Sequence, residues 1–341
     1  GQATGQIIFY TDGVNIWNTS HVLQSNALLN TNWNSSQLAG LKKSTHAALI
    51  APIPKSNPKS YFVFTTTAGT ATTSISSGSG YGPLRVSIVR EQSGALPNIT
   101  FTVDPAEKNV QLTPGGVLVG EKLAITSDGT TCGYWVITDG VGTYGGNASS
   151  EPPSYIAPPG SSPAVNTNGL GRFYAYHITE TTTTISQLGA TRVDSYFSTG
   201  GHKSWGHSYG ASYMTPGDYT ISRGQMKFSQ DGKKLACALT NMQEVQLYDF
   251  DKTTGLLSSQ ILLNDLCFGG YGHAGSGCYS EAMPYGLEFS PNGTYLYVST
   301  MGNVTNQSLY QVDITGGTAQ LIGQSRNVRE YISNQNSPYY G

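Results

Sequence analysis

Three stretches of the sequence share one pattern, and this pattern decides the fold. They read Leu123-Ala-Ile-Thr-Ser-Asp-Gly-Thr-Thr-Cys-Gly-Tyr-Trp-Val-Ile-Thr138, Met226-Lys-Phe-Ser-Gln-Asp-Gly-Lys-Lys-Leu-Ala-Cys-Ala-Leu-Thr240 and Leu287-Glu-Phe-Ser-Pro-Asn-Gly-Thr-Tyr-Leu-Tyr-Val-Ser-Thr300. Each predicts a short strand, a turn at Asp-Gly or Asn-Gly, and a second strand. These dipeptides suit the positive φ angles that tight hairpin turns require. The three stretches are therefore predicted to be copies of one hairpin.

Two further strands are predicted after each hairpin, so that each unit has four. They are 172–178 and 184–188, 244–250 and 257–263, and 308–314 and 319–323, and a less regular copy covers 47–53, 61–65, 84–89 and 109–112. Repeated four-stranded units are typical of a β-propeller. We therefore expect an all-β protein, a β-propeller of four-stranded blades, with about five blades visible as part of a seven-bladed ring.

The whole chain, residues 1–341, is predicted to be a single β-propeller domain that is incomplete at both ends. Three long insertions, 144–170, 196–222 and 265–284, interrupt the repeat and are rich in Gly, Ser, Tyr or Pro, which predicts surface loops. Residues 6–18 indicate two strands of a blade whose first strand is absent. Upstream sequence, the tail around 327–332 or another chain is expected to fill that position.

The composition excludes several classes of protein. The 341 residues contain 18 basic and 20 acidic side chains, and only 11% are charged, which argues against a nucleic-acid partner. The sequence contains no apolar stretch long enough for a transmembrane helix, so direct membrane insertion is not expected. Good helix formers are sparse, so little helix is expected.

Four cysteines occur without the spacing of a zinc site, and no metal or other cofactor is predicted. Cys267 and Cys278 flank a Gly-rich loop, and we expect a disulfide between them. Cys132 and Cys237 lie in strand-like stretches, where buried thiols and a second bridge are both open readings.

Several blocks together resemble a known family. They are Ile7-Ile-Phe-Tyr-Thr-Asp-Gly-Val-Asn-Ile-Trp-Asn18, Glu121-Lys-Leu123, Cys132-Gly-Tyr-Trp-Val-Ile-Thr138 and Tyr285-Gly-Leu-Glu-Phe-Ser-Pro-Asn-Gly293. In this order they are similar to the extracellular propeller region of Bacteroidetes surface proteins that are gliding-motility-associated or type IX-secreted and often bear PKD domains. The resemblance implies an exported, cell-surface protein in adhesion or surface architecture, and it supplies no catalytic residues. The three insertions depart from the family pattern.

The motifs that could carry catalysis are poorly placed. Gly206-His-Ser-Tyr-Gly210 matches a nucleophile elbow, but neither a strand before it nor a helix after it is predicted. Residues 249–255 lack the Gly and Glu spacing of a calcium loop. Residues 78–82 are Gly-rich without a following helix, so phosphate binding is not expected. No catalytic residue is predicted.

Two sets of residues are candidates for ligand binding. The first set comprises polar residues on or near the innermost strands of the blades, where they would face the central channel or pair with neighbouring blades: His46, Glu121, Lys122, Arg223 and Glu288. The second set comprises aromatic residues of the insertions, which suit glycan or protein recognition or packing beneath the loops, and we select Trp205, Tyr209 and Tyr271 from it.

Seven Asn-x-Ser/Thr sequons suggest a glycosylated, exported protein. They begin at Asn18, Asn34, Asn98, Asn147, Asn292, Asn303 and Asn306.

Taken together, the sequence predicts a non-enzymatic, extracellular or cell-surface β-propeller that serves as an adhesion, interaction or structural module. Its expected partners are other surface or filament proteins, or glycans, within a longer polypeptide or assembly. The first alternative is a propeller enzyme, such as a glycan lyase, lactonase or hydrolase, with a site at the channel mouth. The second alternative is a subunit of an extracellular filament or sheath.

Overall fold

The computed structural model describes thirteen parts of the chain: residues 7–24, 46, 48–66, 83–94, 98–113, 117–130, 132–143, 172–197, 224–240, 244–263, 283–301, 309–314 and 320–321. They belong to two compact units, and each is described by itself. The first unit comprises residues 1–199, 215–219 and 252–256, and the second comprises 200–214, 220–251 and 257–341. That the chain is one propeller domain remains a prediction.

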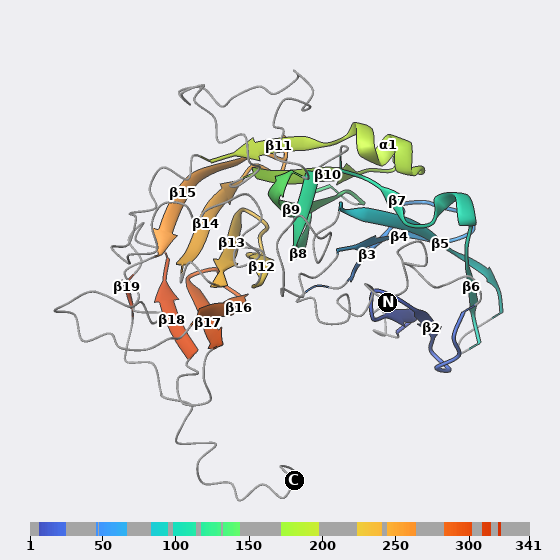
Figure 1. The fold of residues 1–341 in the computed structure, drawn as a ribbon, viewed down its shortest axis with the longest axis horizontal. Helices are drawn as coiled ribbons and strands as arrows, with labels where there is room; N and C mark the ends of the chain where they lie inside the picture. Colours follow the sequence, from blue (N-terminus) through green and yellow to red (C-terminus); the bar gives the residue numbers. More distant parts are fainter. Residues whose placement is uncertain are drawn as a thin grey trace, which may run out of the picture. The chain divides into compact units, whose positions relative to one another are not determined.

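The first unit contains a hairpin and two larger antiparallel sheets (Figure 1). Its strands are β1 (Phe9–Thr11), β2 (Ile16–Asn18), β3 (Ala48–Pro52), β4 (Ser60–Thr65), β5 (Arg85–Ser93), β6 (Thr100–Val103), β7 (Val110–Gln111), β8 (Val117–Ser127), β9 (Tyr134–Thr143), β10 (Arg172–Ile178) and β11 (Val193–Tyr196). A 3-10 turn η3 (Pro105–Glu107) and a helix α1 (Ile185–Ala190) complete it. The strands follow in chain order as β3-β4-β5-β6, with β7 added beside β5, and as β8-β9-β10-β11.

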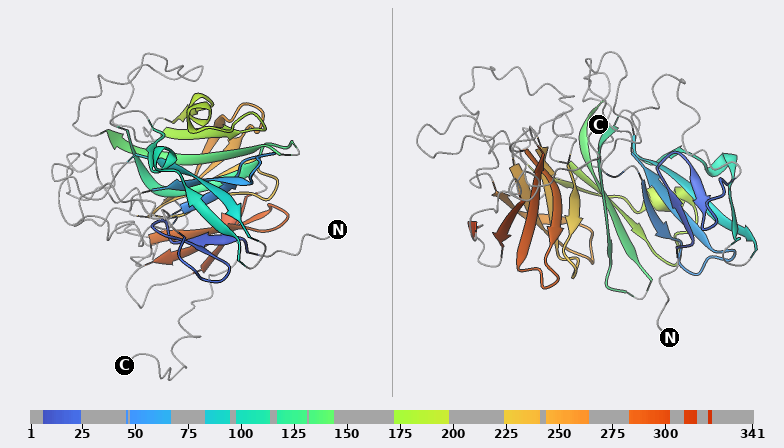
Figure 2. Two further views of the ribbon diagram at one scale, coloured as in Figure 1. Left: turned by 90° about the vertical axis from the view of Figure 1, so that its right-hand side faces the viewer. Right: turned by 90° about the horizontal axis from the view of Figure 1, so that it is seen from below.

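The second unit contains two four-stranded antiparallel sheets. Their strands are β12 (Met226–Phe228), β13 (Lys234–Leu239), β14 (Glu244–Phe250), β15 (Leu257–Leu263), β16 (Met283–Phe289), β17 (Tyr295–Met301), β18 (Leu309–Asp313) and β19 (Gln320–Leu321). Both sheets follow chain order, β12-β13-β14-β15 and β16-β17-β18-β19, and their twist is visible from below in Figure 2. The prediction of an all-β protein with sheets of four antiparallel strands and few helices is confirmed.

The hairpin turns repeat as the sequence predicts. In the second unit, Ser229 Oγ donates to the Asp231 carboxylate at 2.6 Å, and Ser290 Oγ donates to the Asn292 side-chain oxygen at 2.7 Å. The following glycines, Gly232 and Gly293, have φ of +71° and +69°. Gly is favoured here because it has no Cβ to collide with the backbone at positive φ.

Two predicted strands differ from the structure. The fourth strand of the first large sheet is β6 and not 109–112, of which Val110–Gln111 form β7 on β5. Residues 184–188 form the start of α1 instead, because Thr184 and Gln187 make a capping box. The Thr184 hydroxyl accepts the backbone N–H of Gln187, and the Gln187 side chain accepts the N–H of Thr184. The fourth strand of the second large sheet is β11, which follows the helix.

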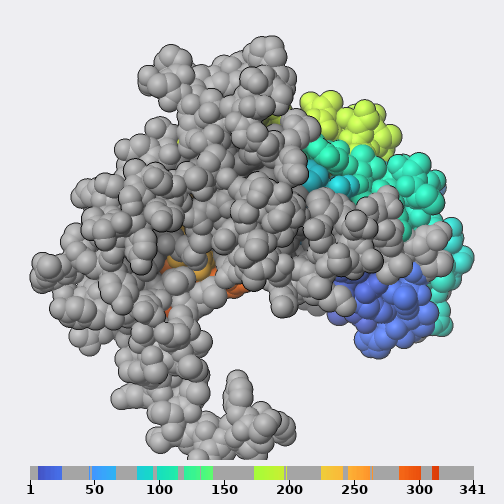
Figure 3. Space-filling model, viewed as in Figure 1, coloured from blue at the N-terminus to red at the C-terminus, as the bar shows by residue number. Residues whose placement is uncertain are grey.

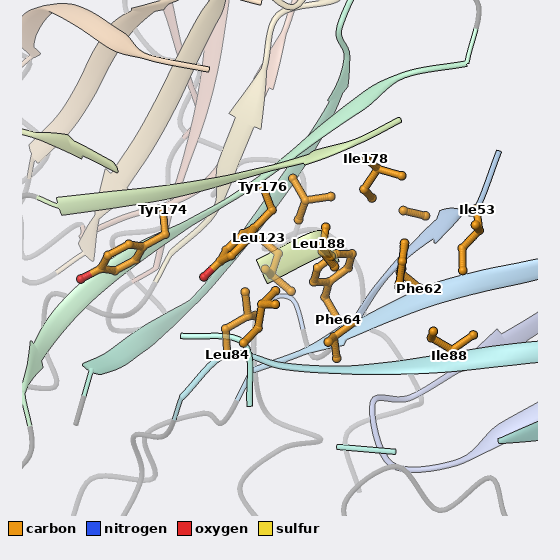
Figure 4. Close-up of a cluster of buried hydrophobic side chains, with 14 of the residues drawn as sticks. Ile53, Phe62, Phe64, Leu84, Ile88, Leu123, Tyr174, Tyr176, Ile178 and Leu188 are labelled. Carbon is orange, nitrogen blue, oxygen red and sulfur yellow. The ribbon is translucent and has the colours of Figure 1, made fainter. Parts of the chain in front are cut away.

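Each core lies between facing sheets. In the first unit, Phe62, Phe64, Leu84 and Ile88 from one sheet pack with Tyr176 of β10 and its neighbours from the other (Figure 4). A separate cluster joins the β1–β2 hairpin, through Phe9 and Ile16, to the other face of the β3–β6 sheet. The second unit has its own core between the β12–β15 and β16–β19 sheets.

Candidate functional site

The first strand of the second large sheet is distorted in its middle. β8 pairs regularly with β9 from Leu123 opposite Thr138 onward, but Val119 is opposite Gly140. Residues 120–122 therefore lie opposite Asp139 alone, which makes a β-bulge. Bulges of this kind are frequent beside active sites, because they redirect side chains out of the regular alternation.

A buried ion pair occupies this bulge. The Lys122 ammonium lies 2.7 Å from Asp139 Oδ2, and the two side chains are 0% and 9% exposed. Thr138 Oγ1 donates to the carbonyl of Lys122 at 2.9 Å, which fixes the backbone at the bulge. Removing two charges from water is expensive, so a pair of this kind is weak evidence for stability.

The second oxygen of the Asp139 carboxylate is arranged differently. Oδ1 is buried and has no hydrogen-bond partner among the described residues. It faces the α-carbon of Gly120, where a Cβ would lie 2.6 Å from it. The absence of a side chain at Gly120 therefore leaves room for the carboxylate.

Residues that flank the neighbouring β3–β6 sheet contact the β8 bulge. The backbone N–H of His46 donates to the carbonyl of Glu121 at 3.3 Å, and Thr66 Oγ1 donates to the carbonyl of His46 at 3.0 Å. Glu121 is 4% exposed. These contacts bring together three residues predicted to lie at the innermost strands, namely His46, Glu121 and Lys122. Asp139 was not among the predicted residues, although it follows the apolar stretch 134–137 with only Thr138 between them.

The other predicted ligand-binding residues are not part of this group. Glu288 lies in the second unit on β16, is exposed, and pairs with Lys227 at 3.1 Å across the surface. Arg223, Trp205, Tyr209 and Tyr271 lie outside the described residues.

The cysteine prediction is tested only in part. Cys267 and Cys278 lie outside the described residues, so their disulfide remains a prediction. Cys132 is a half-buried thiol, and Cys237 is a buried thiol on β13.

The sequons differ in their surroundings. Asn18 is 4% exposed, and its amide donates to the carbonyl of Ile99 at 3.2 Å, so this side chain is engaged in the fold. Asn98 and Asn292 are exposed. The sequons at Asn34, Asn147, Asn303 and Asn306 lie outside the described residues.

A second polar cluster fastens the turn between β8 and β9 to β10. His177 Nε2 is 2.9 Å from Asp128 Oδ2, and the ring of Trp135 stacks on the ring of His177 at 4.1 Å between centroids and 4° between planes. Burial of the Asp128 carboxyl favours its neutral form, but hydrogen bonds from Thr130 and His177 outweigh this and hold its pKa below the ordinary value. The cluster is complete in itself, because the carboxylate is bound by Thr130 and His177 and the His177 ring is covered by Trp135. We assign it a structural role.

Two other features are absent from the described residues. Within those parts of the chain, no group of three or more His, Cys, Asp or Glu side chains is placed to hold a metal ion. Among the helices described there, none is both long and apolar enough to cross a membrane.

Comparison with known proteins gives structural likeness alone, since neither a family model nor a curated protein matches the sequence. A periplasmic gluconolactonase of Pseudomonas aeruginosa is 11% identical, with a TM-score of 0.36 over 94% of this chain and 82% of that one. A luciferin-regenerating enzyme is 12% identical, with a TM-score of 0.33 over 85% and 79%. A protein from Lactobacillus plantarum is 13% identical, with a TM-score of 0.40 over 95% and 79%.

These findings correct the functional prediction. The solved structures that resemble the chain include lactonase-type enzymes, which contradicts the expectation of a non-enzymatic adhesion or structural module. At 11–13% identity and TM-scores of 0.33–0.40 the likeness says nothing of the chemistry, which has to be argued from the residues of this chain.

Proposed function

We propose that the chain is an enzyme of the propeller type, a hydrolase of esters or lactones, with its acid–base group at the β8 bulge. The observation that carries this proposal is the buried Lys122–Asp139 pair, in which one carboxylate oxygen is bound by the ammonium and the other is left without a partner among the described residues.

The pair has the two functions that ester hydrolysis requires. A base must take a proton from the attacking water, and a cation must stabilise the oxyanion that forms at the carbonyl. Asp139 Oδ1 is the base and Lys122 the cation in this proposal. The water oxygen bonds to the carbonyl carbon, its proton passes to Asp139, and the C–O bond to the alkoxide then breaks. The same carboxyl returns the proton to the leaving alkoxide, so that the pair ends as it began.

The experiment compares three variants with the wild type on a panel of p-nitrophenyl esters and of five- and six-membered lactones. Asp139→Asn removes the base, and we expect its kcat/KM to fall by about 100-fold or more. Glu288→Gln changes an exposed carboxylate elsewhere and should leave the rate unchanged. A wild type without activity on the whole panel, or an Asp139→Asn variant as active as the wild type, overturns the proposal.

The third variant separates loss of chemistry from loss of folding. Lys122→Met/Asp139→Leu replaces the pair by apolar groups, a change that other proteins tolerate with little loss of stability. We expect this protein to fold and to be inactive. If it is folded and retains the wild-type rate, the chemistry lies elsewhere.

The larger assembly and its location are proposals of a different kind. The four-stranded sheets follow one another in the sequence, which supports the proposal that they are blades of one propeller ring, and about seven blades remains the predicted number.

Export to the cell surface, in a protein like the Bacteroidetes surface proteins, is the location that the sequence predicts. Fractionation of the native cells with an antibody to the chain tests the location, and recovery in the cytosol alone would contradict it.

A further inference from the structure

The backbone around Lys122 is held from two sides. On one side, Thr138 Oγ1 donates to the carbonyl of Lys122 at 2.9 Å. On the other side, the backbone N–H of His46 donates to the carbonyl of Glu121, the preceding residue, at 3.3 Å. The carbonyl of His46 in turn accepts from Thr66 Oγ1 at 3.0 Å. Two successive carbonyls of the β8 bulge are therefore bound, one by β9 and one by residues that flank the β3–β4 pair.

Thr138 is the donor that lies next to the ion pair along the chain. It directly precedes Asp139 on β9, and both Thr138 and Lys122 are 0% exposed. Regular pairing of β8 with β9 resumes only at Leu123, opposite Thr138, so Lys122 lies in the part of β8 that the register leaves out. Two neighbouring residues of β9 thus bind the two ends of Lys122: Asp139 binds its ammonium, and Thr138 binds its backbone.

The position of the ammonium depends on that of the backbone. Lysine has a flexible four-carbon stem, so a shift of the Lys122 backbone can carry the ammonium away from Asp139 Oδ2, which lies 2.7 Å from it. A misplacement of about 1 Å at a reacting group can cost about 100-fold in rate. Thr138 therefore has a means of acting on the chemistry without touching the substrate.

We propose that Thr138 is a positioning residue of the site at the β8 bulge. Its hydroxyl fixes the Lys122 backbone, so that the ammonium stays on Asp139 Oδ2 and leaves Oδ1 to the attacking water. This inference rests on the proposed function, because it concerns the same ion pair. Thr138 acts through Lys122 alone, so kcat should depend on the Thr138 hydroxyl and KM should not.

The first test measures kcat and KM separately. Thr138→Val removes the hydroxyl and keeps the branched shape of the side chain. We expect kcat to fall by about tenfold or more and KM to change by less than about twofold, because the loss falls on the reacting groups and not on substrate binding. Thr138→Ser restores a hydroxyl and should recover most of the rate. A purely structural Thr138 would change the amount of folded protein and leave kcat per folded molecule unaltered.

The matched control is Thr182→Val, the same substitution at a second buried hydroxyl of the first unit. Thr182 is 2% exposed, and its hydroxyl accepts the backbone N–H of Thr179 at 3.1 Å. It follows the end of β10 at Ile178, which is opposite Tyr134, so it lies beyond the end of β9 that is remote from the bulge. The segment 172–197 around it forms the yellow-green part of the surface in Figure 3. Thr182→Val should keep the kcat of the wild type.

The second test does not depend on activity. It follows the NMR signal of the Lys122 ammonium, assigned by its loss in Lys122→Met/Asp139→Leu. The signal should be present in the wild type, in Thr138→Ser and in Thr182→Val, and it should be broadened or lost in Thr138→Val. A wild type without this signal, or a signal that Thr138→Val leaves unchanged, overturns the inference.

The two tests separate this inference from the proposed function. If Asp139→Asn loses its rate and Thr138→Val keeps the wild-type kcat, the proposed function stands and the inference is overturned. If no substrate of the panel is hydrolysed by the wild type but the ammonium signal responds as expected, the proposed function is overturned, and the positioning of Lys122 by Thr138 is supported.

Discussion

Lys122 is the residue on which the proposed chemistry and the local stability both depend. Its side chain is fully buried, and its ammonium is the partner of the Asp139 carboxylate. If Lys122 becomes Met, that carboxylate stays buried without its cation. We expect the free energy of unfolding to fall by about 3–5 kcal/mol, measured by urea denaturation at neutral pH. Lys122→Met/Asp139→Leu should recover most of this loss, and a double variant as unstable as the single one would contradict the argument.

Gly120 is predicted not to tolerate a larger side chain, for a steric reason. A Cβ at this position would lie 2.6 Å from Asp139 Oδ1, so Gly120→Ala must displace the carboxylate from Lys122. We expect a loss of about 1–3 kcal/mol in urea denaturation, together with a loss of the proposed activity.

A second glycine provides the control. Gly189 lies in α1, and a Cβ there would meet Leu112 at an ordinary 3.7 Å. Gly189→Ala should be neutral or stabilise by about 0.5–1 kcal/mol, because Ala loses less backbone freedom in a helix. Equal losses in the two variants would argue against a specific role for Gly120.

At the scale of residues, the sequence predicted part of the site. His46, Glu121 and Lys122 were selected because polar residues near first strands would face a central channel or pair with neighbouring blades, and the structure places them close together. Glu288 met the same criterion but pairs on the surface with Lys227. Asp139 was not predicted, because only the three-residue bulge turns it toward Lys122, and the register of a bulge depends on tertiary contacts.

At the scale of elements, the hairpins were predictable and the strand after β10 was not. The turns at Asp231 and Asn292 carry their own signal, since a side-chain oxygen and a glycine at positive φ fix the backbone locally. Residues 184–188 were predicted to be a strand, yet Ile185 and Leu188 are spaced as on one face of a helix, and the Thr184–Gln187 capping box starts a helix there.

The turn between β8 and β9 should give the fold a measurable pH dependence. The pKa of Asp128 is lower in the folded protein than in the unfolded chain, so its contribution to stability is present above the unfolded pKa and is lost as the pH falls through the folded one. Asp128→Asn should lower the free energy of unfolding by about 1–2 kcal/mol at neutral pH. The difference from the wild type should shrink in acid, as urea titrations across the pH range would reveal.

The control for this turn is an exposed acidic residue. Glu180 pairs with Lys55 at 2.6 Å, but the two side chains are 47% and 67% exposed. Glu180→Gln should change stability by less than about 1 kcal/mol at any pH. A loss for Asp128→Asn that persists unchanged in acid would mean that its carboxylate charge is not the cause.

At the scale of the whole molecule, the cores limit how far a local change can act. The first unit has buried clusters between its own sheets, and the second unit has a separate one. Local opening of a protein follows such cooperative units, whose opening free energies differ. Damage at the β8 bulge is therefore predicted to be confined to the first unit.

Amide exchange of Gly120→Ala followed by mass spectrometry tests this prediction. We expect faster exchange in β8, β9 and β10, because the bulge belongs to their sheet and packs on the core of the first unit. Peptides from β13, β14 and β17 should exchange as in the wild type, since their core is built from the second unit alone. Uniform acceleration throughout both units would mean that they open as one cooperative structure, and the division into two units would then hold for their packing but not for their stability.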